Sequence, residues 1–435
     1  MLHGIQLAGS FSRFPFPVSR ETPRLRSMKI FGSHDPATLA QLEDVRSRAA
    51  DAALMADGHV GYVMPIGGVA AYRDQVSVVG VGFDIACGNA AIHTDLTLAQ
   101  LGDSPEEVRR TLTGLADEIA GTVSFGIGRN NRADDAPVDH PLFDDPAWDA
   151  VPHKHRRELL HKARSQLGTV GSGNHYVDVF ADEADDIWVG VHFGSRGFGH
   201  TIASSFIAIS QGKGWGERAP EREALLDIAA PAGHDYWHLM NLAGRYAYAG
   251  REWVARKVVE ILGANEVDLV HNHHNFAWRE THGGEEMIVV RKGATPAFPG
   301  QRGFIGGSMG DDAVIVRGVE PNAVSEQVAE AQRGALYSTV HGAGRVMSRT
   351  QAAGKRNRKT GVVLTPGQVS PEMMQEWVNA KGVILRGGGL DESPHVYRRL
   401  PEVLAAQEGT VEVLHTLRPL VVVMAGEREF DPYKD

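Results

Sequence analysis

Short apolar runs that end in glycine-rich turns recur along the chain, and this pattern limits the fold more than any other feature of the sequence. Three such runs predict β-strands: 187–193 (IWVGVHF), 285–292 (EEMIVVRK) and 313–318 (AVIVRG). A serine cap, a first-turn proline and a capping-box glutamate at 104–107 predict a helix to about Ile119. The apolar spacing of residues 234–262 predicts a longer helix. The fold therefore combines strands and helices joined by tight turns.

Length and cysteine usage bound the class of protein. A chain of 435 residues allows two or three domains or one large unit. A single cysteine excludes an intramolecular disulfide and favours a reducing cytoplasm, and no apolar run approaches the roughly 20 residues that cross a bilayer. Residues 1–27 contain three prolines and no sustained apolar core, so we expect a flexible extension rather than a signal peptide. The sequence predicts a cytoplasmic protein without a membrane partner.

The one cysteine lies in an unusual turn. Cys87 follows Asp84 by three residues in the glycine-punctuated stretch 82–88 (GFDIACG). A lone cysteine is usually a small buried apolar residue. Three other segments, however, combine histidine with tight backbone: 171–178 (GSGNHYVD), 191–200 (VHFGSRGFGH) and 271–276 (HNHHNF). Imidazole, thiolate and carboxylate held on rigid turns predict a mixed metal site.

Two further segments point to phosphate chemistry. Residues 306–312 (GGSMGDD) form a glycine turn, and in 338–349 (STVHGAGRVMSR) a histidine precedes Gly-Ala-Gly-Arg. Such a histidine is either a nucleophile beside backbone N–H donors and a guanidinium, or an exposed residue in a plain turn. The net charge of −10 argues against binding nucleic acid through overall charge. RNA contact would need a local groove, which the basic run 353–361 is predicted to border. Residues 291–297 (RKGATPA) add an Arg-Lys pair before a glycine turn as a further candidate for phosphate contact.

Seven ordered motifs resemble those of the RtcB family of RNA-splicing ligases, between about Met28 and Gly426: GFDIACG, GSGNHYV, HFGSRGFGH, HHNF, RKGAT, GSMG and STVHGAGRVMSR. The resemblance implies a single large α/β (α+β) catalytic domain, residues 28–435, with mixed sheets around a central metal cleft. It implies two manganese ions, GTP, and the joining of an RNA 3′-phosphate or 2′,3′-cyclic phosphate to a 5′-hydroxyl in tRNA splicing or RNA repair. An archease-like activator is a further partner that the resemblance suggests.

The resemblance also implies roles for single residues. His341 matches the histidine that becomes covalently guanylylated, and Asp57 matches the aspartate that orients it. The Cys87 thiolate is expected to bridge both ions, and five residues match metal ligands: Asp84, Cys87, His175, His192 and His274. The residues that match nucleotide or phosphate contacts are Asn174, Asp178, Arg196, Asn275, Gly307, Ser308, Met309, Gly310, Gly342, Ala343, Gly344 and Arg345.

Two positions depart from the family pattern, and both concern the base. Asp178 stands where many members have a glutamate, and Met424 stands where a lysine that reaches guanine is usual. A divergent paralogue with looser nucleotide selectivity is the corresponding interpretation. Two other functions stay open: a metal-dependent RNA cyclic phosphodiesterase without ligation, and a non-catalytic module that binds RNA ends. An intact HGAGR motif argues against both, because neither needs an imidazole poised for covalent transfer.

Overall fold

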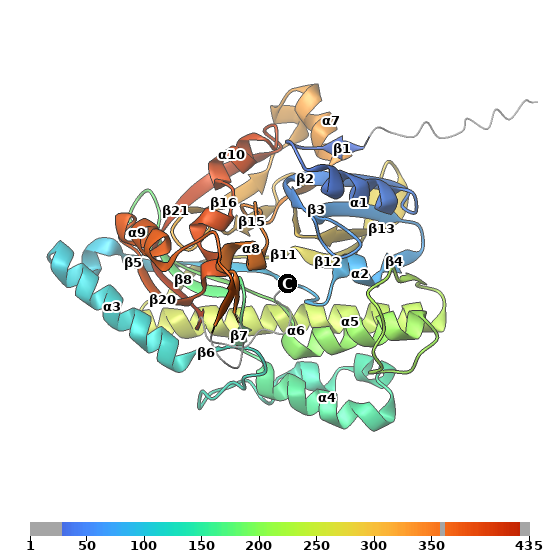
Figure 1. The fold of residues 1–435 in the computed structure, drawn as a ribbon, viewed down its shortest axis with the longest axis horizontal. Coiled ribbons are helices and arrows are strands. Elements are labelled where there is room, and N and C mark those ends of the chain that lie inside the picture. The colour runs from blue at the N-terminus through green and yellow to red at the C-terminus, as the bar shows by residue number, and fades with distance from the viewer. Residues whose placement is uncertain (1–27, 357–361, 427–435) are drawn as a thin grey trace, which may run out of the picture.

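Two β-sheets and the helices packed on them form a single α/β domain (Figure 1), as the sequence predicts. The structure is a computed structural model and describes residues 28–356 and 362–426. The expected extension 1–27 and residues 357–361 of the basic run lie outside the described residues. None of the described helices is both long and apolar enough to cross a membrane.

The larger sheet has eight strands. One of them, β20, pairs in parallel with β21, and all the other pairings are antiparallel. Its strands are β11 (Glu266–His273), β5 (Gly88–Thr97), β9 (Asp186–Phe193), β8 (Tyr176–Ala181), β21 (Val411–Gly426), β16 (Ala313–Gly318), β15 (Arg302–Ile305) and β20 (Ile384–Gly388). The smaller sheet has five strands, with β1 parallel to β2. These are β1 (Lys29–Ile30), β2 (Asp51–His59), β3 (Ile66–Tyr72), β13 (Glu285–Lys292) and β12 (Asn275–His282). Both sheets are mixed, which confirms the prediction.

Short strands pair locally around the two sheets. They are β4 (Gln75–Ser77), β6 (Ser124–Phe125), β7 (Thr169–Gly171), β10 (Leu225–Asp227), β14 (Ala294–Pro296), β17 (Ser338–Val340), β18 (Lys355–Arg356) and β19 (Val363–Thr365). The helices are α1 (Pro36–Arg46), α2 (Val78–Val81), α3 (Pro105–Thr122), α4 (His153–Gln166), α5 (Arg196–Ser210), α6 (Pro231–Leu262), α7 (Glu326–Gly334), α8 (Arg349–Ala353), α9 (Pro371–Ala380) and α10 (Leu400–Ala405).

The predicted elements match these bounds closely. Strands β13 and β16 have the predicted limits, β9 begins one residue earlier, and α6 begins at Pro231 rather than at residue 234. Ser104 caps α3 by accepting the Glu107 N–H. The capping box is incomplete, because the Glu107 carboxylate accepts the N–H of Asp103 and not that of Ser104. The helix then continues to Thr122.

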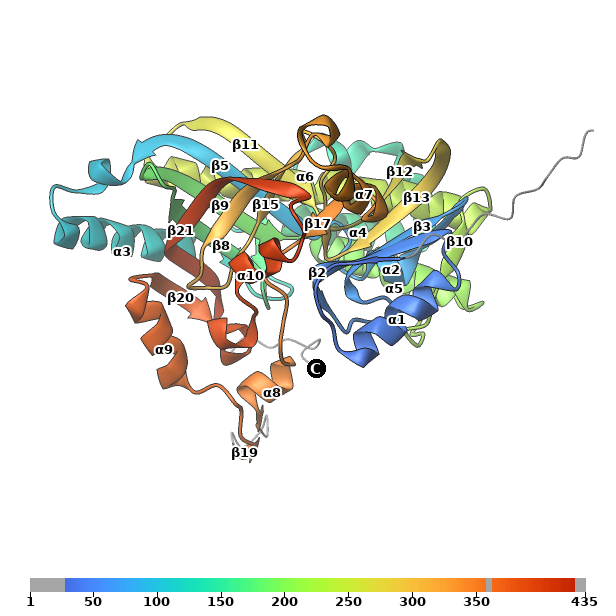
Figure 2. The ribbon, with the colours of Figure 1, turned by 90° about the horizontal axis from the view of Figure 1, so that it is seen from above.

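The two faces of the eight-stranded sheet differ in their cover. One face packs Val177, Val189 and Val191 against α3 and α6. On the opposite face, Trp188, Gly190 and His192 alternate along β9 beside an aromatic cluster. We call this opposite side the aromatic face, and its cluster comprises Tyr176, Phe180, Trp188, Phe304, Met309 and Met424. The strands β5, β9, β8 and β21 are hydrogen-bonded neighbours in that order. Figure 2 shows them with α3 in one half of the molecule, while β2 and β3 lie in the other half.

Candidate metal centre and nucleophile

The turn that carries Asp84 and Cys87 links α2 to β5. The Cys87 N–H donates to Asp84 O at 3.1 Å, and Ala86 lies in the left-handed region with φ +61°. At the position after Cys87 only glycine fits, because a Cβ on Gly88 would lie 2.2 Å from Asn272 O. This tight turn directs the carboxylate and the thiol to the same point.

The five predicted metal ligands meet there as two groups of three. Cys87 belongs to both groups: one holds Cys87, His192 and His274, and the other holds Asp84, Cys87 and His175. Cys87 Sγ lies 3.2 Å from His192 Nε2 and 3.6 Å from His175 Nε2. His175 Nε2 in turn lies 3.1 Å from Asp84 Oδ2. One sulfur shared by two ligand groups fits a thiolate that bridges two ions.

The centre lies where the chain passes from one sheet to the other. His274 stands between β11 of the larger sheet and β12 of the smaller sheet. Its backbone N–H donates to Cys87 O at 2.8 Å, and the N–H of Asn275 donates to the same oxygen at 3.2 Å. His192 is held by strand pairing opposite Asn89. The ligands are therefore positioned by both sheets rather than by one loop.

Burial sets the protonation of this centre. Desolvation lowers the pKa values of His192 and His274 well below the usual imidazole range, so both rings are neutral with free lone pairs at neutral pH. Burial also raises the pKa of the Cys87 thiol well above its usual range. Burial opposes ionisation of Asp84, but its contacts with His175, Arg196 and Cys87 together outweigh this and lower the pKa to about 2. His274 Nδ1 is buried without a hydrogen-bond partner among the described residues. A cation would satisfy that nitrogen and promote loss of the thiol proton.

A buried arginine behind the centre was missed by the sequence analysis. Arg251, on α6, is fully buried and donates to Ala86 O at 2.9 Å and Phe193 O at 2.6 Å. Its Nε and Nη2 atoms contact His271 Nε2 at 2.9 Å and His273 Nδ1 at 2.8 Å, respectively. Burial lowers the pKa of Arg251 to about 10, which leaves it charged at neutral pH. It thus fixes the backbone beside both Cys87 and His192. Little in the sequence indicates this role, because α6 carries three arginines and only the fold buries Arg251.

The predicted nucleophile lies next to the metal centre. His341 follows β17, and its ring contacts the His274 ring edge-on with 4.9 Å between centroids. His341 Nδ1 lies 2.6 Å from Oδ2 of Asp57, which is fully buried on β2. The same oxygen accepts the backbone N–H of His341 at 3.0 Å. Gly344 allows this approach, because its φ is +74° and a Cβ there would lie 2.4 Å from Asp57 O. The arrangement fixes the ring and leaves Nε2 as the nitrogen not engaged by Asp57.

The two predicted phosphate turns are neighbours. A Cβ on Gly342 would lie 3.5 Å from Gly306 O, so the turn after His341 lies beside the turn at 306–310. Ser308 Oγ donates to Asp311 Oδ2 at 2.6 Å. Most of these residues are closely packed: Gly307 against the backbone of 311–312, Gly310 against Trp377, Met309 in the aromatic cluster, and Ala343 in the core that includes Val340.

The two arginines predicted to contact phosphate, Arg196 and Arg345, already contact other residues of the protein. Arg345 donates to Asp391 O at 2.7 Å and also contacts Glu392 and Tyr397. Arg196, the first residue of α5, lies against Gly171, and its Nη1 is 3.1 Å from His175 Nδ1. The phosphate roles of Arg196 and Arg345 stay predictions.

The two predicted asparagines lie beside the ligand histidines. Asn275 Oδ1 accepts the Gly293 N–H at 2.7 Å, while Asn174 is half-buried in the turn before His175. Arg349, another residue that the sequence analysis did not select, covers that turn: a Cβ on Gly173 would lie 3.1 Å from its guanidinium.

The Arg-Lys pair at 291–292 does not face a phosphate site. Arg291 is fully buried and paired with Glu280 at 2.6 Å. Lys292 is buried and donates to Tyr62 O and Val79 O. Both cations serve the interior of the smaller sheet, which corrects the interpretation that the Arg-Lys pair of RKGATPA contributes to phosphate binding.

The two positions that depart from the family pattern lie together on the aromatic face. Asp178 is paired with Val422, and Met424 is paired with Tyr176, so Met424 is the diagonal neighbour of Asp178. Burial raises the pKa of Asp178 well above the usual carboxyl range. Asp178 Oδ1 and the Tyr176 hydroxyl are both buried without a hydrogen-bond partner among the described residues. Two such atoms indicate a place for a polar ligand.

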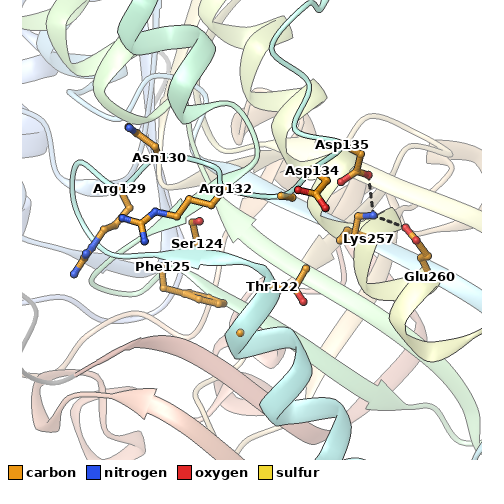
Figure 3. A pocket seen from close by; sticks show the side chains of 12 residues that line it. Thr122, Ser124, Phe125, Arg129, Asn130, Arg132, Asp134, Asp135, Lys257 and Glu260 are labelled. Carbon is orange, nitrogen blue, oxygen red and sulfur yellow. Dashed lines mark hydrogen bonds and ion pairs between the residues drawn. The ribbon is translucent and has the colours of Figure 1, made fainter.

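A hollow of about 650 Å³ lies one strand away from the centre (Figure 3). Its lining includes residues of β6, which pairs with β7. On β7, the backbone oxygen of Val170 lies 2.9 Å from His175 Nδ1. The lining residues carry charges of both signs: Gly121, Thr122, Ser124, Phe125, Arg129, Asn130, Arg132, Ala133, Asp134, Asp135, Lys257 and Glu260. Lys257 is paired with Asp135 and Glu260.

The fold and the site define a class of α/β protein in which a thiolate, imidazoles and a carboxylate surround a buried centre beside a histidine–carboxylate pair. The chain matches the family model described as "tRNA-splicing ligase RtcB" over residues 37–425. It therefore belongs to the RtcB family.

Named relatives agree with the family match. The RNA-splicing ligase RtcB of Escherichia coli (strain K12) is 32% identical over 392 residues, which cover 85% of this chain and 89% of that protein. The tRNA-splicing ligase RtcB of Archaeoglobus fulgidus is 31% identical over 446 residues, with 85% and 86% covered. The RNA-splicing ligase RtcB of Mycobacterium bovis is 30% identical over 439 residues, with 84% and 95% covered.

Proposed function

We propose that this protein is an RNA ligase that uses GTP and two Mn²⁺ ions to join RNA 3′-phosphate or 2′,3′-cyclic phosphate ends to 5′-hydroxyl ends. A single observation carries the proposal. The ring of His341 is fixed by buried Asp57 and contacts His274, one of the five predicted metal ligands. Splicing of tRNA or repair of RNA in the cytoplasm is the corresponding setting, with residues 28–435 as one catalytic domain. An archease-like activator stays a prediction of the resemblance.

The proposed ion ligands are the five residues of the buried centre. Neutral imidazoles, a carboxylate and a thiol that can lose its proton suit ions such as Mn²⁺ or Zn²⁺. When bound, the ions neutralise phosphate charge and activate water or a hydroxyl. Arg251 holds the backbone next to Cys87 and His192 in place through the carbonyls of Ala86 and Phe193.

His341 is the proposed nucleophile. The contact of Nδ1 with Asp57 leaves Nε2 to attack the α-phosphorus of GTP, so that a P–N bond forms and the P–O bond to pyrophosphate breaks. Asp57 stabilises the positive charge that develops on the ring. An oxygen of the RNA 3′-phosphate then attacks the same phosphorus and displaces His341. The 5′-hydroxyl next attacks the RNA phosphate, loses its proton and releases GMP. A cyclic phosphate is first opened by water.

The proposed base site is the polar gap at Asp178. Guanine offers N1–H and N2–H donors. Asp178 Oδ1 is buried and has no hydrogen-bond partner in the part of the chain that the structure describes, so it can accept one of them. The neighbouring Met424 supplies no donor for the guanine O6. We expect GTP to be preferred, with detectable adduct from ATP or another triphosphate at millimolar concentration.

The RNA strand is proposed to run over the hollow beside β6. Exposed Arg132 and half-buried Phe125 provide a cation for phosphate and a ring for base stacking, one strand away from His175. We expect Arg132→Ala to weaken RNA binding at a given salt concentration and to leave protein–GMP formation unchanged.

Labelling with α-³²P GTP and Mn²⁺, followed by a denaturing gel, tests the proposal. Label retained on the protein and lost in His341→Ala supports a ligase, and joining of a 3′-phosphate RNA to a 5′-hydroxyl RNA completes the case. Opening of a 2′,3′-cyclic phosphate without label on the protein would identify a phosphodiesterase instead. RNA-end binding without either reaction would identify a binding module. His153→Ala, at an exposed position of α4, is the matched control.

A further inference from the structure

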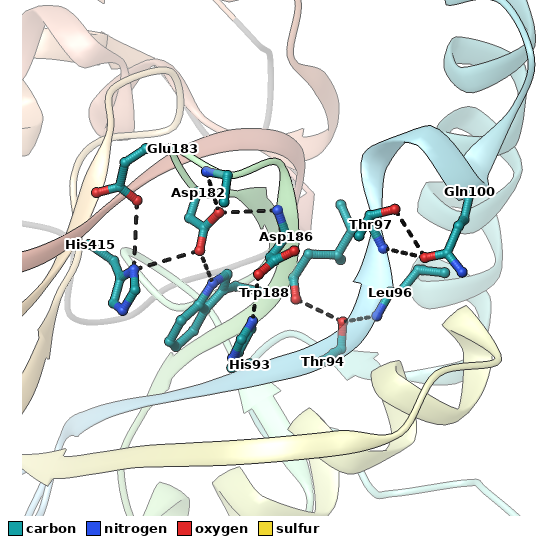
Figure 4. A network of polar contacts seen from close by, with 12 residues as sticks. His93, Thr94, Leu96, Thr97, Gln100, Asp182, Glu183, Asp186, Trp188 and His415 are labelled. Atoms are coloured by element: carbon teal, nitrogen blue, oxygen red, sulfur yellow. Dashed lines mark hydrogen bonds and ion pairs between the residues drawn. The ribbon is translucent and has the colours of Figure 1, made fainter.

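A second group of histidines and carboxylates lies on three strands of the larger sheet and on the connection between β8 and β9, away from the proposed catalytic centre (Figure 4). Asp182 and Glu183 follow β8, Asp186 begins β9, His93 is on β5 and His415 is on β21. We call these five residues the peripheral cluster. Two groups of ligand atoms within it share Asp182.

The peripheral cluster is separate from the two groups of ligands that share Cys87. His93 pairs with Trp188, and Trp188 is four residues from His192 along β9. At about 3.3 Å per residue this separation is about 13 Å. The same ion therefore cannot bind at both places.

The spacing around His415 is that of ligands rather than of hydrogen-bond partners. His415 Nδ1 lies 3.6 Å from Asp182 Oδ2 and 3.6 Å from Glu183 Oε2. Both distances exceed those of good hydrogen bonds. Ligand atoms about 2.1 Å from a tetrahedral ion are about 3.4 Å from one another. The three atoms are thus spaced to surround one ion.

Both carboxylates are oriented by other groups. Asp182 is nearly buried, and its Oδ1 accepts the N–H groups of Ala184 at 2.9 Å and Asp186 at 3.0 Å. Its Oδ2 accepts the Trp188 indole N–H at 3.0 Å. Glu183 Oε1 accepts the backbone N–H of Thr416 at 3.0 Å, which leaves Oε2 to face His415. Outer contacts of this kind fix metal-binding carboxylates.

The second imidazole extends the cluster. His93 Nε2 lies 3.3 Å from Asp186 Oδ2, and its ring stacks on Trp188 with 4.6 Å between centroids. The His415 ring contacts the same indole at 5.2 Å. Both histidines are therefore held by one aromatic side chain while their nitrogens face acidic oxygens.

We propose that the peripheral cluster binds one divalent metal ion of the Zn²⁺ class, with His415, Asp182 and Glu183 as the main ligands and His93 and Asp186 beside them. Imidazole nitrogens combined with carboxylate oxygens suit such an ion. The ion would join β21 to the connection between β8 and β9 and so strengthen the edge of the aromatic face. The alternative is a set of ion pairs that form only when the histidines are protonated.

Equilibrium dialysis of the full chain against Zn²⁺, followed by elemental analysis, tests this site. We expect His415→Ala and Glu183→Gln each to bind one ion fewer than the parent protein, in the natural sequence and in a Cys87→Ser background. In that background Zn²⁺ should raise the Tm of the parent and leave the Tm of the double variant Cys87→Ser/His415→Ala unchanged. Adduct formation with GTP should be unaffected by His415→Ala.

His238→Ala is the matched control, because exposed His238 and His234 approach to 3.1 Å and form another histidine pair that could bind Zn²⁺. Loss of the additional ion in this control, with no loss in His415→Ala, would overturn the proposal. Equal ion content in the parent and in both cluster variants would overturn it too. Failure of GTP labelling bears only on the proposed ligase function, since the Zn²⁺ count does not depend on that reaction.

Discussion

Two groups of histidines and acidic residues occupy opposite ends of the aromatic face, and they differ in burial and in support. The group at Cys87 is buried, contains a thiol and is backed by the guanidinium of Arg251. The peripheral cluster has half-exposed histidines and is oriented by backbone N–H groups and one indole. Only the buried group adjoins a candidate nucleophile, His341.

The difference in burial is the reason that we propose only the group at Cys87 as a reaction centre. At the buried group, desolvation keeps His192 and His274 neutral. The low local dielectric constant also strengthens the electrostatic interactions of any charge bound there. At the peripheral cluster, solvent competes for the same ligand types, so binding can stabilise the sheet without activating a substrate. The two groups should therefore respond independently to substitution.

The largest expected effect comes from His341→Ala, which tests whether reactivity belongs to the buried group alone. Protein–GMP should vanish, because no other described group occupies the position fixed by Asp57. Ion content at both groups should stay nearly normal. Denaturing gels and elemental analysis measure the two quantities. Normal adduct formation in this variant would remove His341 from the mechanism.

Cys87→Ser should be next in size and should separate the two groups. A neutral hydroxyl cannot replace a bridging thiolate. Loss of an outer contact weakens metal binding about 10- to 100-fold, so loss of this ligand should cost more than about 100-fold and abolish ligation. Metal titration and RNA ligation assays check this, and the peripheral ion should remain. An unchanged affinity for the central ions would leave Cys87 as a packing residue.

Arg251→Met should lower the free energy of unfolding, because it removes the donor that holds the backbone next to Cys87 and His192. The Ala86 and Phe193 carbonyls would each lose a buried donor, at about 1–3 kcal/mol each. Urea unfolding should therefore report a loss of about 2–6 kcal/mol. Arg256→Met, on the same helix but exposed and paired with Glu252 and Glu266, should cost about 0–1 kcal/mol. Equal losses in both variants would contradict the proposed support.

Met424→Lys should have the smallest effect, confined to the base site between the two groups. A charged donor near Asp178 should favour guanine by about 1.5–3 kcal/mol, or roughly 10- to 100-fold in the preference for GTP over ATP. Competition of labelled GTP with each unlabelled triphosphate measures this ratio. Strict GTP selectivity already present in the natural protein would mean that another residue contacts O6.

The buried centre could be predicted from sequence because each ligand lies in or beside a turn with a recognisable local pattern. GFDIACG places Asp84 and Cys87 on one tight turn, and the structure gives that turn the required left-handed residue at Ala86. The family resemblance assigned the histidines to the same centre. The strands that carry the apolar runs were equally visible, since their limits coincide with glycine turns.

The remaining features depend on pairing between distant segments. His93 and His415 lie singly on β5 and β21, and only the sheet order brings them to Asp182. Arg251 is one charge inside a helix, and its partners lie on three other elements. Arg291 was misread for the reverse reason: a cation before a glycine turn suggested phosphate. In the structure Arg291 lies opposite Phe276, and its side chain pairs with Glu280 further along β12, a contact that only the packed sheet reveals.

The solitary thiol also gives the chain a built-in reporter. Because the sequence has no second cysteine, any thiol-directed reagent that modifies the folded protein must react at Cys87. In protein stripped of ions, the modification rate measures how often the turn between α2 and β5 opens to solvent. Protection by added ions would then give their occupancy directly, without radioactive label, RNA or nucleotide. One sulfur atom thus makes the local dynamics of this turn measurable by absorbance alone.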